Sequence, residues 1–314
     1  MGVDLANFAE SVGDQTTGPV WVIGQQTRVA APFGVRQVEA PCGIYDLQPD
    51  EMTVVCGAGT PINELQEALS AVGQYVNLPI SSSGSGTVGG ALAQGHGDIY
   101  RLGRGATRDT LLQVRYVNHD GHVVMAGGPT VKNVSGFDLC RLFVGSFGRL
   151  GFMGETILRT RPVPQSSRWF HLEQASTKCV NTVLQWVYRP ASVLTNGQDV
   201  WFCIEGHPKD CDETITQLSP TLPNIVEVTG PPDLQSFPYR RSMSPAQLST
   251  LFAPEAENTQ LIVEAGVGVV HSHLPTPTPI AEAAVTLIHQ RILHEFNPTG
   301  RLNPGINLIS GMTQ

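Results

Sequence analysis

Glycine is concentrated in one stretch of the chain, and this concentration constrains the fold more than any other feature of the sequence. Residues 84–154 hold 16 of the 33 glycines, whereas the residues after 154 hold only 8. Glycine lacks a Cβ and adopts backbone conformations that other residues avoid, so this stretch is expected to consist largely of loops and turns. The glycines follow no fixed period, which excludes a collagen-like chain.

Proline has the opposite distribution and marks a change of composition. Pro162 and the residues after it hold 16 of the 23 prolines. We therefore expect a domain boundary at residues 161–164, with a differently built unit after it. The chain has 314 residues, of which 41% are hydrophobic, enough to bury the cores of about two domains.

The charge of the chain argues against a nucleic-acid partner. Its 19 basic and 27 acidic residues give a formal net charge of −8, and no basic cluster is longer than Arg240-Arg241. The remaining dense group of arginines is interleaved with glycine, which favours a small anionic ligand over a polymer. This group comprises Arg101, Arg104, Arg108 and Arg115.

The sequence contains no signal for a membrane or for export. No apolar run approaches the roughly 18 residues of a transmembrane helix. The first residues, MGVDLANFAESVGD, have neither the basic region nor the apolar core of a signal peptide. We therefore expect a cytoplasmic protein without a transmembrane segment.

Cysteine and histidine do not form an evident metal site. The six cysteines are scattered without a CxxC motif, so we expect buried apolar side chains and no iron–sulfur cluster on this chain. His271 and His273 share one face of any strand, but Glu264 is their only nearby acidic neighbour. Metal binding is therefore not expected, and the roles of these two histidines and of His96 stay open.

Hydrophobic periodicity and turn residues predict the regular elements. Thr60 and Pro61 are expected to start an amphipathic helix at the N-cap and first helical positions. Asp120-Gly121 is typical of the turn of a β-hairpin. The predicted strands are 19–23, 51–56, 111–118, 122–125, 152–160, 200–204 and 261–270, and the predicted helices are 61–72, 177–187 and about 280–296, the last with Ala284, Leu287, Ile288 and Ile292 on its apolar face.

The motif Gly84-Ser-Gly86-Thr-Val-Gly89 matches the dinucleotide-binding pattern GxGxxG, but its context is wrong for a Rossmann fold. That fold needs a strand before the motif and a helix after it. The match follows a run of serines, and the next twenty residues contain Gly95, Gly97, Gly103 and Gly105. We therefore expect neither a useful helix nor a Rossmann fold over residues 79–110.

The glycines still predict an anion site. Without a Cβ, successive backbone N–H groups can converge on an anion and form a nest. Ser85 and Thr87 add hydroxyl groups, and Arg101 or Arg104 could neutralise charge. A second loop, Gly24-Gln-Gln-Thr-Arg28, also leaves a predicted strand. Two such loops suggest a cofactor that contains a pyrophosphate, and ordinary turns are the alternative.

Three stretches resemble a known family. They are 84–92 (GSGTVGGAL), 132–155 (KNVSGFDL continuing to GSFGRLGFMGE) and 296–305 (FNPTGRLNPG). Together they resemble the FAD-binding domain of the vanillyl-alcohol oxidase / p-cresol methylhydroxylase (PCMH) type. The run KNVSGFDL is similar to the FAD-binding subunit of glycolate oxidase. The resemblance is strong over about 1–165, weak over 166–285, and returns at 286–314.

This resemblance implies an α+β architecture. A two-subdomain FAD-binding domain of the PCMH type would occupy 1–162, and a reduced α+β cap domain 163–285. Residues 286–314 would return to the FAD domain.

The resemblance also implies which residues hold FAD. Two loops would wrap the diphosphate, and residues 148–155 would pass beside the adenosine and flavin. The turn at Asn303 would lead back from the cap to the flavin domain. The implied cofactor-binding residues are Gly24, Gln25, Gln26, Thr27, Arg28, Ser85, Gly86, Thr87, Val88, Gly89, Gly90, Gly148, Gly151, Phe152, Glu155 and Asn303.

The sequence departs from the family where covalent members attach their flavin. Those members use a His in the first loop, and some add a Cys near the second. The first loop here reads Gln25-Gln26-Thr27, and 79–90 contains no Cys, so non-covalent FAD is expected. The first loop is also a few residues shorter than is usual for the family.

The predicted function is that of an FAD-binding subunit in a glycolate (2-hydroxy-acid) oxidase complex, with a role in electron relay or assembly. Its partners would be a catalytic flavin subunit and an iron–sulfur subunit. No catalytic residue is assigned, because no His-rich motif stands out in the cap. Two alternatives are a self-sufficient FAD oxidoreductase of a small hydroxy acid or alcohol, and a structural subunit that has lost FAD.

Overall fold

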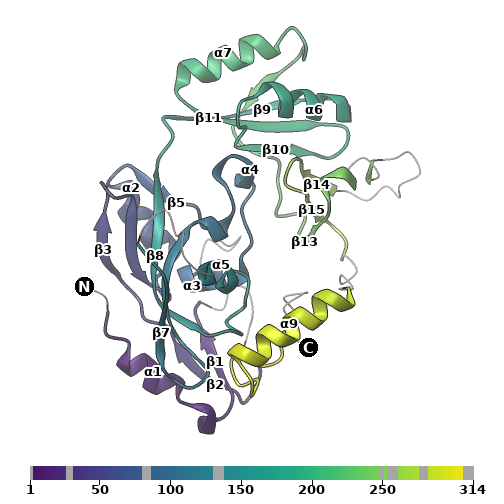
Figure 1. The fold of residues 1–314 in the computed structure, drawn as a ribbon. Coiled ribbons are helices and arrows are strands. Elements are labelled where there is room, and N and C mark those ends of the chain that lie inside the picture. The colour runs from purple at the N-terminus through teal and green to yellow at the C-terminus, as the bar shows by residue number, and fades with distance from the viewer. Residues whose placement is uncertain are drawn as a thin grey trace. The chain divides into compact units, whose positions relative to one another are not determined.

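The computed structural model of the chain contains two compact units (Figure 1). Unit 1 comprises residues 1–98, 106–163 and 278–314, and unit 2 comprises 99–105 and 164–277. The structure describes residues 3–25, 31–79, 86–129, 138–247, 251–252, 261–275 and 282–306. Unit 2 thus takes in a short early segment, 99–105, that the change in composition near Pro162 does not indicate.

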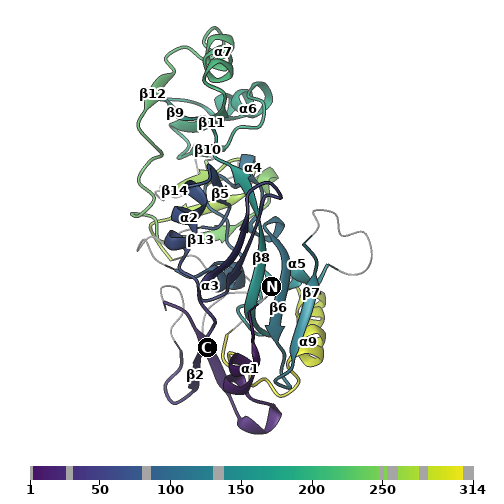
Figure 2. The same ribbon diagram turned by 90° about the vertical axis from the view of Figure 1, so that its left-hand side faces the viewer.

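The main sheet of unit 1 is antiparallel throughout its described pairs. Its order is β3-β4-β8-β6-β7, and the short strand β5 also pairs with β8. Figure 2 shows β6, β7 and β8 side by side. The strands are β3 (Ile44–Gln48), β4 (Thr53–Gly57), β5 (Gln74–Val76), β6 (Leu111–Val117), β7 (Val123–Gly127) and β8 (Phe152–Pro162). This topology confirms the α+β class and the predicted hairpin, and it differs from the parallel sheet of a Rossmann fold.

Helix α2 (Ile62–Ser70) covers this sheet with one apolar face. Ile62, Leu65 and Leu69 recur at helical spacing, and all three are buried in the same core as strand residue Val54. The predicted N-cap is wrong, because the Thr60 hydroxyl bonds the backbone of Gly43 instead of the helix. Pro61 occupies the N-cap position.

A smaller two-stranded parallel sheet forms the second part of unit 1. It consists of β1 (Val20–Ile23) and β2 (Arg36–Glu39), preceded by helix α1 (Ala6–Val12) and the 3₁₀ turn η1 (Gln15–Thr17). Arg301 fastens the C-terminal segment to this region. Its buried guanidinium donates to the carbonyl groups of Val12, Gly18 and His119 at 2.5, 3.1 and 3.2 Å.

The glycine-rich stretch contains more helix than the sequence predicts. Helix α3 (Val88–Gln94) follows the GxGxxG motif directly, and the Thr87 hydroxyl caps it by accepting from the Gly90 amide at 3.1 Å. Val88, Ala91 and Leu92 are buried on one face, and this packing outweighs the low helix propensity of glycine. The other short elements are α4 (Arg101–Arg104), η2 (Thr107–Asp109) and α5 (Leu139–Phe143).

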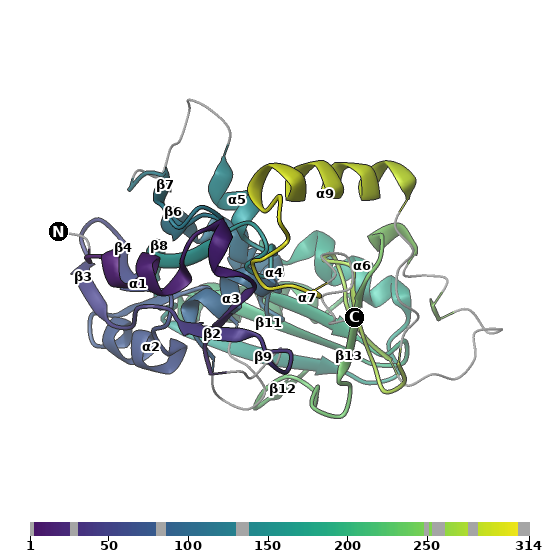
Figure 3. The same ribbon diagram turned by 90° about the horizontal axis from the view of Figure 1, so that it is seen from below.

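Helix α9 (Ala283–Phe296) returns the chain to unit 1, and only its C-terminal half is packed. Ile292, Leu293 and Phe296 lie against the core, and Figure 3 shows α9 beside α5, where the rings of Phe143 and Phe296 meet edge to face. On the predicted apolar face, Leu287 and Ile288 remain 49% and 56% exposed. No described helix is long and apolar enough to cross a membrane.

Unit 2 is one antiparallel sheet with helices packed on it. The order is β12-β9-β11-β10-β14-β15-β13, and α6 and α7 contribute Val183 and Leu218 to its core. The predicted single strand 261–270 is in fact a hairpin with its turn at 265–268. The elements are β9 (Ser166–Leu172), α6 (Thr177–Trp186), β10 (Ser192–Thr195), β11 (Val200–Gly206), α7 (Pro208–Leu218), β12 (Val226–Val228), β13 (Tyr239–Ser242), η3 (Pro245–Gln247), β14 (Leu261–Glu264) and β15 (Val269–Ser272).

Candidate FAD site

A cavity in unit 1 collects the residues that the sequence predicts around a cofactor. It encloses about 830 Å³ of space, open solvent included. It lies where the ends of β1 and β8, helix α3 and the C-terminal segment meet. Its lining residues are Trp21, Val22, Ile23, Gly24, Gln25, Ala40, Ala58, Thr87, Gly89, Gly90, Ala93, Gln94, Phe147, Gly148, Gly151, Phe152, Met153, Asn303 and Ile306.

Most of the predicted cofactor residues that the structure describes line this cavity. They are Gly24, Gln25, Thr87, Gly89, Gly90, Gly148, Gly151, Phe152 and Asn303. Gly86 and Val88 lie directly beside lining residues in the chain but do not line it themselves. Gln26, Thr27, Arg28 and Ser85 lie outside the described residues.

The side chain of Glu155 does not line the cavity and instead makes hydrogen bonds inside unit 1. Its buried carboxylate accepts from the Val3 amide at 2.6 Å and from the Arg115 guanidinium at 3.2 Å. Glu155 therefore ties the N-terminal segment to β8, and Arg115 neutralises its charge. Glu155 is not among the residues that line the cavity.

Asn303 joins three walls of the cavity. Its Oδ1 accepts from the Val22 amide at 2.9 Å, and its Nδ2 donates to the Phe147 carbonyl at 2.7 Å. Behind it, Arg149 donates to the Asn303 carbonyl at 3.2 Å. Burial lowers the pKa of the Arg149 guanidinium. The C-terminal segment is thereby held against β1 and against the loop that precedes β8.

The lining glycines are needed because other chain segments approach them closely. A Cβ at Gly24 would lie 2.7 Å from the Thr87 hydroxyl oxygen, and one at Gly89 would lie 2.9 Å from the Cβ of Ala58. At Gly148, with φ of +71°, a Cβ would lie 2.6 Å from Nδ2 of Asn303. Only glycine lets these backbones meet around the cavity.

The predicted nest of free amides is not formed by the described part of the second loop. The amides of Gly86, Val88 and Gly89 donate to Gln25 Oε1, the Thr60 carbonyl and the Ala58 carbonyl. The Gly90 amide donates to the Thr87 hydroxyl. Glycine serves here for close packing, and these four N–H groups are already satisfied within the protein.

The arginines expected near the anion belong to unit 2. Arg104 makes two hydrogen bonds to Glu205 of β11, and its guanidinium lies 4.0 Å from the centre of the Tyr100 ring. Arg101 is in the same short helix of unit 2. Arg104 is therefore engaged in an ion pair inside unit 2, and the expectation that Arg101 or Arg104 neutralises a ligand stays a prediction.

The chemistry of the lining fits a dinucleotide with planar rings. No lining residue among those described carries an ionisable side chain. The lining consists mainly of aromatic and aliphatic side chains and of glycines. Phe152, Met153 and Ile306 offer apolar contact for a ring system, while Gln25, Thr87 and Asn303 supply polar atoms. Trp21, Val22, Ala58 and Met153 also line the cavity but were not predicted from the sequence, although the first two lie in the predicted strand that enters the first loop.

The histidines left open by the sequence have partners outside this cavity. In unit 2, His271 Nε2 lies 2.7 Å from Oε1 of the buried Glu264, and His273 Nδ1 lies 2.9 Å from the Ser236 carbonyl. In unit 1, the carbonyl of His96 accepts from the Thr107 hydroxyl at 2.9 Å. Among the described residues, no group of three or more His, Cys, Asp or Glu side chains could hold a metal ion.

Comparison with known proteins assigns this arrangement to a class. Residues 17–127 match the family described as FAD binding domain. In fold, the chain is similar to alkyldihydroxyacetonephosphate synthase, with a TM-score of 0.66 and 14% identity over 96% of this chain and 74% of that one. It is also similar to a glucose dehydrogenase variant of Phl p 4, with a TM-score of 0.53 and 16% identity over 72% of this chain and 50% of that one. The chain therefore carries an FAD binding domain at residues 17–127.

Two named relatives are similar to this chain in sequence over part of their length. Glycolate oxidase subunit GlcE of Escherichia coli (strain K12) is 28% identical over 64% of this chain and 59% of its own length. Glycolate oxidase subunit GlcD of Bacillus subtilis (strain 168) is 27% identical over 53% of this chain and 36% of its own length. The chain thus spans less than two thirds of these relatives.

Proposed function

We propose that this chain is the FAD-binding subunit of a cytoplasmic oxidoreductase complex that acts on glycolate or a related 2-hydroxy acid. The observation that carries the proposal is the cavity in unit 1, which is lined by several glycines. Asn303 of the C-terminal segment is hydrogen-bonded there to β1 and to the loop at Phe147. Two relatives named as glycolate oxidase subunits support the substrate class.

Bound FAD supplies the capacity to accept a hydride and to pass electrons on. The residues of this chain hold and shield it. Asn303, Gly24 and Thr87 shape the wall, and Phe152, Met153 and Ile306 exclude water from one side of the cavity. The described lining contains no His or Cys, which supports non-covalent binding.

We propose a role in electron relay or assembly beside a catalytic flavin subunit and an iron–sulfur subunit. The curated relatives named as subunits support a complex. No described group in unit 1 combines a histidine base with a cation at the cavity, which supports placing the oxidation of the hydroxy acid on another subunit.

A flavin-reduction assay tests this proposal. The purified chain loaded with FAD is mixed with glycolate or D-lactate without oxygen, alone and after adding the other subunits of the complex. We expect reduction of the flavin bands only in the complex. Reduction by the isolated chain would instead support a self-sufficient oxidoreductase, and a chain that takes up no FAD would support a purely structural subunit.

A further inference from the structure

Two arginines of unit 2 lie near each other, and neither is paired with an acid among the described residues. Arg240 is in β13 and Arg101 is in α4. Neither guanidinium group makes a hydrogen bond or an ion pair with a described residue. Burial lowers the pKa of the Arg240 guanidinium, the charge of Glu264 raises it, and the like charge of Arg101 lowers it again. Because like charges repel, two such guanidinium groups held near each other favour a bound anion.

The register of the unit 2 sheet places a histidine and a carboxylate on the face that carries Arg240. Arg240 of β13 is directly opposite His271 of β15. On the other side of β15, His271 is opposite Ile262 of β14, and Glu264 follows Ile262 by two positions. Directly opposite residues project from the same face of a sheet, and so do residues two apart along a strand. Arg240, His271 and Glu264 therefore share one face.

The early segment of unit 2 brings Arg101 to the same face. Ile99 and Tyr100, the two residues before it, pack against the buried cluster of unit 2 that includes Ile262. Ile262 belongs to the face that carries Arg240. The cations therefore reach this face from two segments that lie far apart in the chain.

Glu264 fixes the orientation of the His271 ring. Glu264 is buried, with 2% of the residue exposed, and its Oε1 lies 2.7 Å from Nε2 of His271. Its Oε2 has no described donor, so this carboxylate depends on His271. A carboxylate only accepts, so Nε2 carries the proton and Nδ1 of the neutral ring is an acceptor. Nδ1 makes no hydrogen bond to a described residue, and the side chain is 14% exposed.

The charges and donors of this cluster select a class of ligand. Two guanidinium groups and one carboxylate leave a single positive charge when the His271 ring is neutral, and a monoanion cancels it. The planar guanidinium group matches a carboxylate, and the free Nδ1 accepts from a hydroxyl group.

We propose that this face of unit 2 binds a small hydroxycarboxylate as a monoanion: Arg101 and Arg240 hold its carboxylate, and its hydroxyl group donates to Nδ1 of His271. The site is built from unit 2 alone. The inference goes beyond the proposed function, because it requires neither bound FAD nor oxidation of the ligand by this chain.

Ligand-observed NMR titrations of the full chain, with and without FAD, test this by measuring dissociation constants for glycolate and acetate. Acetate has the carboxylate but lacks the hydroxyl group. Arg240→Met removes one guanidinium group and keeps an apolar stem. Arg241→Met is the matched control, because Arg241 is the next residue of β13, is opposite Val270 and projects from the other face. His271→Phe removes the acceptor Nδ1.

We expect glycolate to bind with and without FAD, and acetate to bind at least about threefold more weakly. Arg240→Met should weaken glycolate binding at least about tenfold, and Arg241→Met by less than about threefold. His271→Phe should bind glycolate and acetate equally. Circular dichroism reports the folding of each variant. If His271→Phe does not fold, the ratio of glycolate to acetate affinity in the unsubstituted chain decides the part of the hydroxyl group.

The inference is overturned if the unsubstituted chain binds no glycolate, if acetate binds as tightly as glycolate, or if Arg241→Met loses as much affinity as Arg240→Met. Equal preference for glycolate in His271→Phe and the unsubstituted chain overturns the role of Nδ1. A chain that takes up FAD but binds no glycolate overturns this inference alone, since the proposed function puts the oxidation on another subunit. A chain that binds glycolate but takes up no FAD overturns the proposed function alone.

Discussion

Asn303 accepts a hydrogen bond from the backbone amide of Val22, with Oδ1 2.9 Å from the nitrogen and 281 positions of chain between them. The same side chain donates to the Phe147 carbonyl. One residue of the C-terminal segment therefore fixes the strand that enters the first loop and the loop that precedes β8. Asn303 thereby links strand β1 to residues of unit 1 that lie far apart in the chain.

Replacing Asn303 by Ala should destabilise unit 1 and release cofactor. The change removes two hydrogen bonds, leaves the Val22 amide without its partner, and places Ala at a φ of +41°. We expect a loss of about 2–3 kcal/mol of unfolding free energy and a clear loss of bound FAD. Urea unfolding and FAD content per chain measure the two effects.

Asn224→Ala is the matched control for this substitution. Asn224 also has a positive φ, +72°, but it is an exposed residue of unit 2 outside the cavity. We expect a cost of about 1–2 kcal/mol from the backbone conformation alone and unchanged FAD content. Equal loss of FAD in both variants would show that Asn303 has no special part in the site.

Gly148→Ala tests the close approach behind Asn303. The added Cβ would lie 2.6 Å from Nδ2 of Asn303 and would push that side chain from its bond to Phe147. We expect reduced FAD affinity, measured by fluorescence titration. Gly145→Ala carries the same backbone strain, since φ is +90°, but its Cβ meets nothing within 4 Å. If Gly145→Ala lost as much affinity, strain alone would explain the result.

Local patterns were sufficient to predict much of unit 1. Asp120-Gly121 correctly indicated the β6–β7 hairpin, and the spacing of Ile62, Leu65 and Leu69 indicated α2. The helix α3 was missed because four glycines outweighed a weaker signal, Thr87 as a cap followed by Val88, Ala91 and Leu92 on one face. Tertiary packing supplies what helix propensity lacks there.

Long-range pairing could not be predicted from the sequence. Nothing near Arg104 in the sequence indicates that it pairs with Glu205, 101 positions away, and so carries residues 99–105 into unit 2. The same holds for the amides of Gly86 and Gly89, whose acceptors come from Gln25 and Ala58. The concentration of glycine in the sequence indicated where the candidate site lies. Only the fold shows that the N–H groups of Gly86 and Gly89 already donate to acceptors within the protein.

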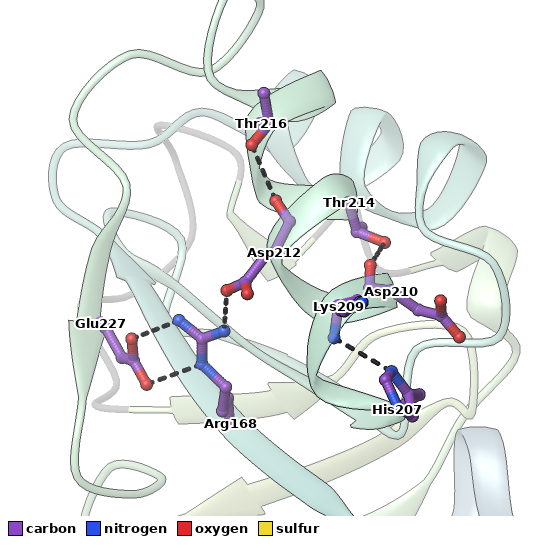
Figure 4. Close-up of polar contacts among 8 residues, drawn as sticks. All are labelled: Arg168, His207, Lys209, Asp210, Asp212, Thr214, Thr216 and Glu227. Atoms are coloured by element: carbon purple, nitrogen blue, oxygen red, sulfur yellow. Dashed lines mark hydrogen bonds and ion pairs between the residues drawn. The ribbon is translucent and has the colours of Figure 1, made fainter.

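An ion-pair cluster on unit 2 predicts a dependence of stability on pH. Arg168 of β9 bonds Asp212 of α7 and both carboxylate oxygens of Glu227 of β12 (Figure 4). The hydrogen bond from Arg168 lowers the pKa of Glu227 below its ordinary value of 4.5. A carboxyl pKa that is lower in the folded state stabilises the fold above that ordinary value, and the contribution disappears as the pH falls through the folded pKa.

Glu227→Gln should therefore lower the unfolding free energy more at pH 7 than near pH 3. Because half of the Glu227 side chain is exposed, the loss should not exceed about 1 kcal/mol, and added salt should reduce it. Urea unfolding at both pH values measures it. The control is Glu213→Gln, an exposed α7 residue without an ion pair among the described residues. A loss as large at pH 3 as at pH 7 would refute the electrostatic explanation.

Thiol labelling should separate the cysteines by burial. Burial raises the pKa of Cys56 and Cys203 to about 12 and that of Cys140 to about 11, so these thiols carry almost no thiolate at pH 8. Cys42 is exposed. We expect one fast-reacting thiol with Ellman's reagent in the native chain, and its loss in Cys42→Ser. Cys179 is half-buried, so a fast phase that survives Cys42→Ser combined with Cys179→Ser would contradict the described burial.

The most direct test of the account is the visible spectrum of the purified chain, stripped of any ligand and then titrated with FAD. The account predicts uptake of one FAD per chain, with perturbed flavin bands and a raised unfolding temperature, and full release of the flavin on denaturation because no covalent bond holds it. Spectra that match free FAD at every ratio, with no change in unfolding temperature, would contradict it.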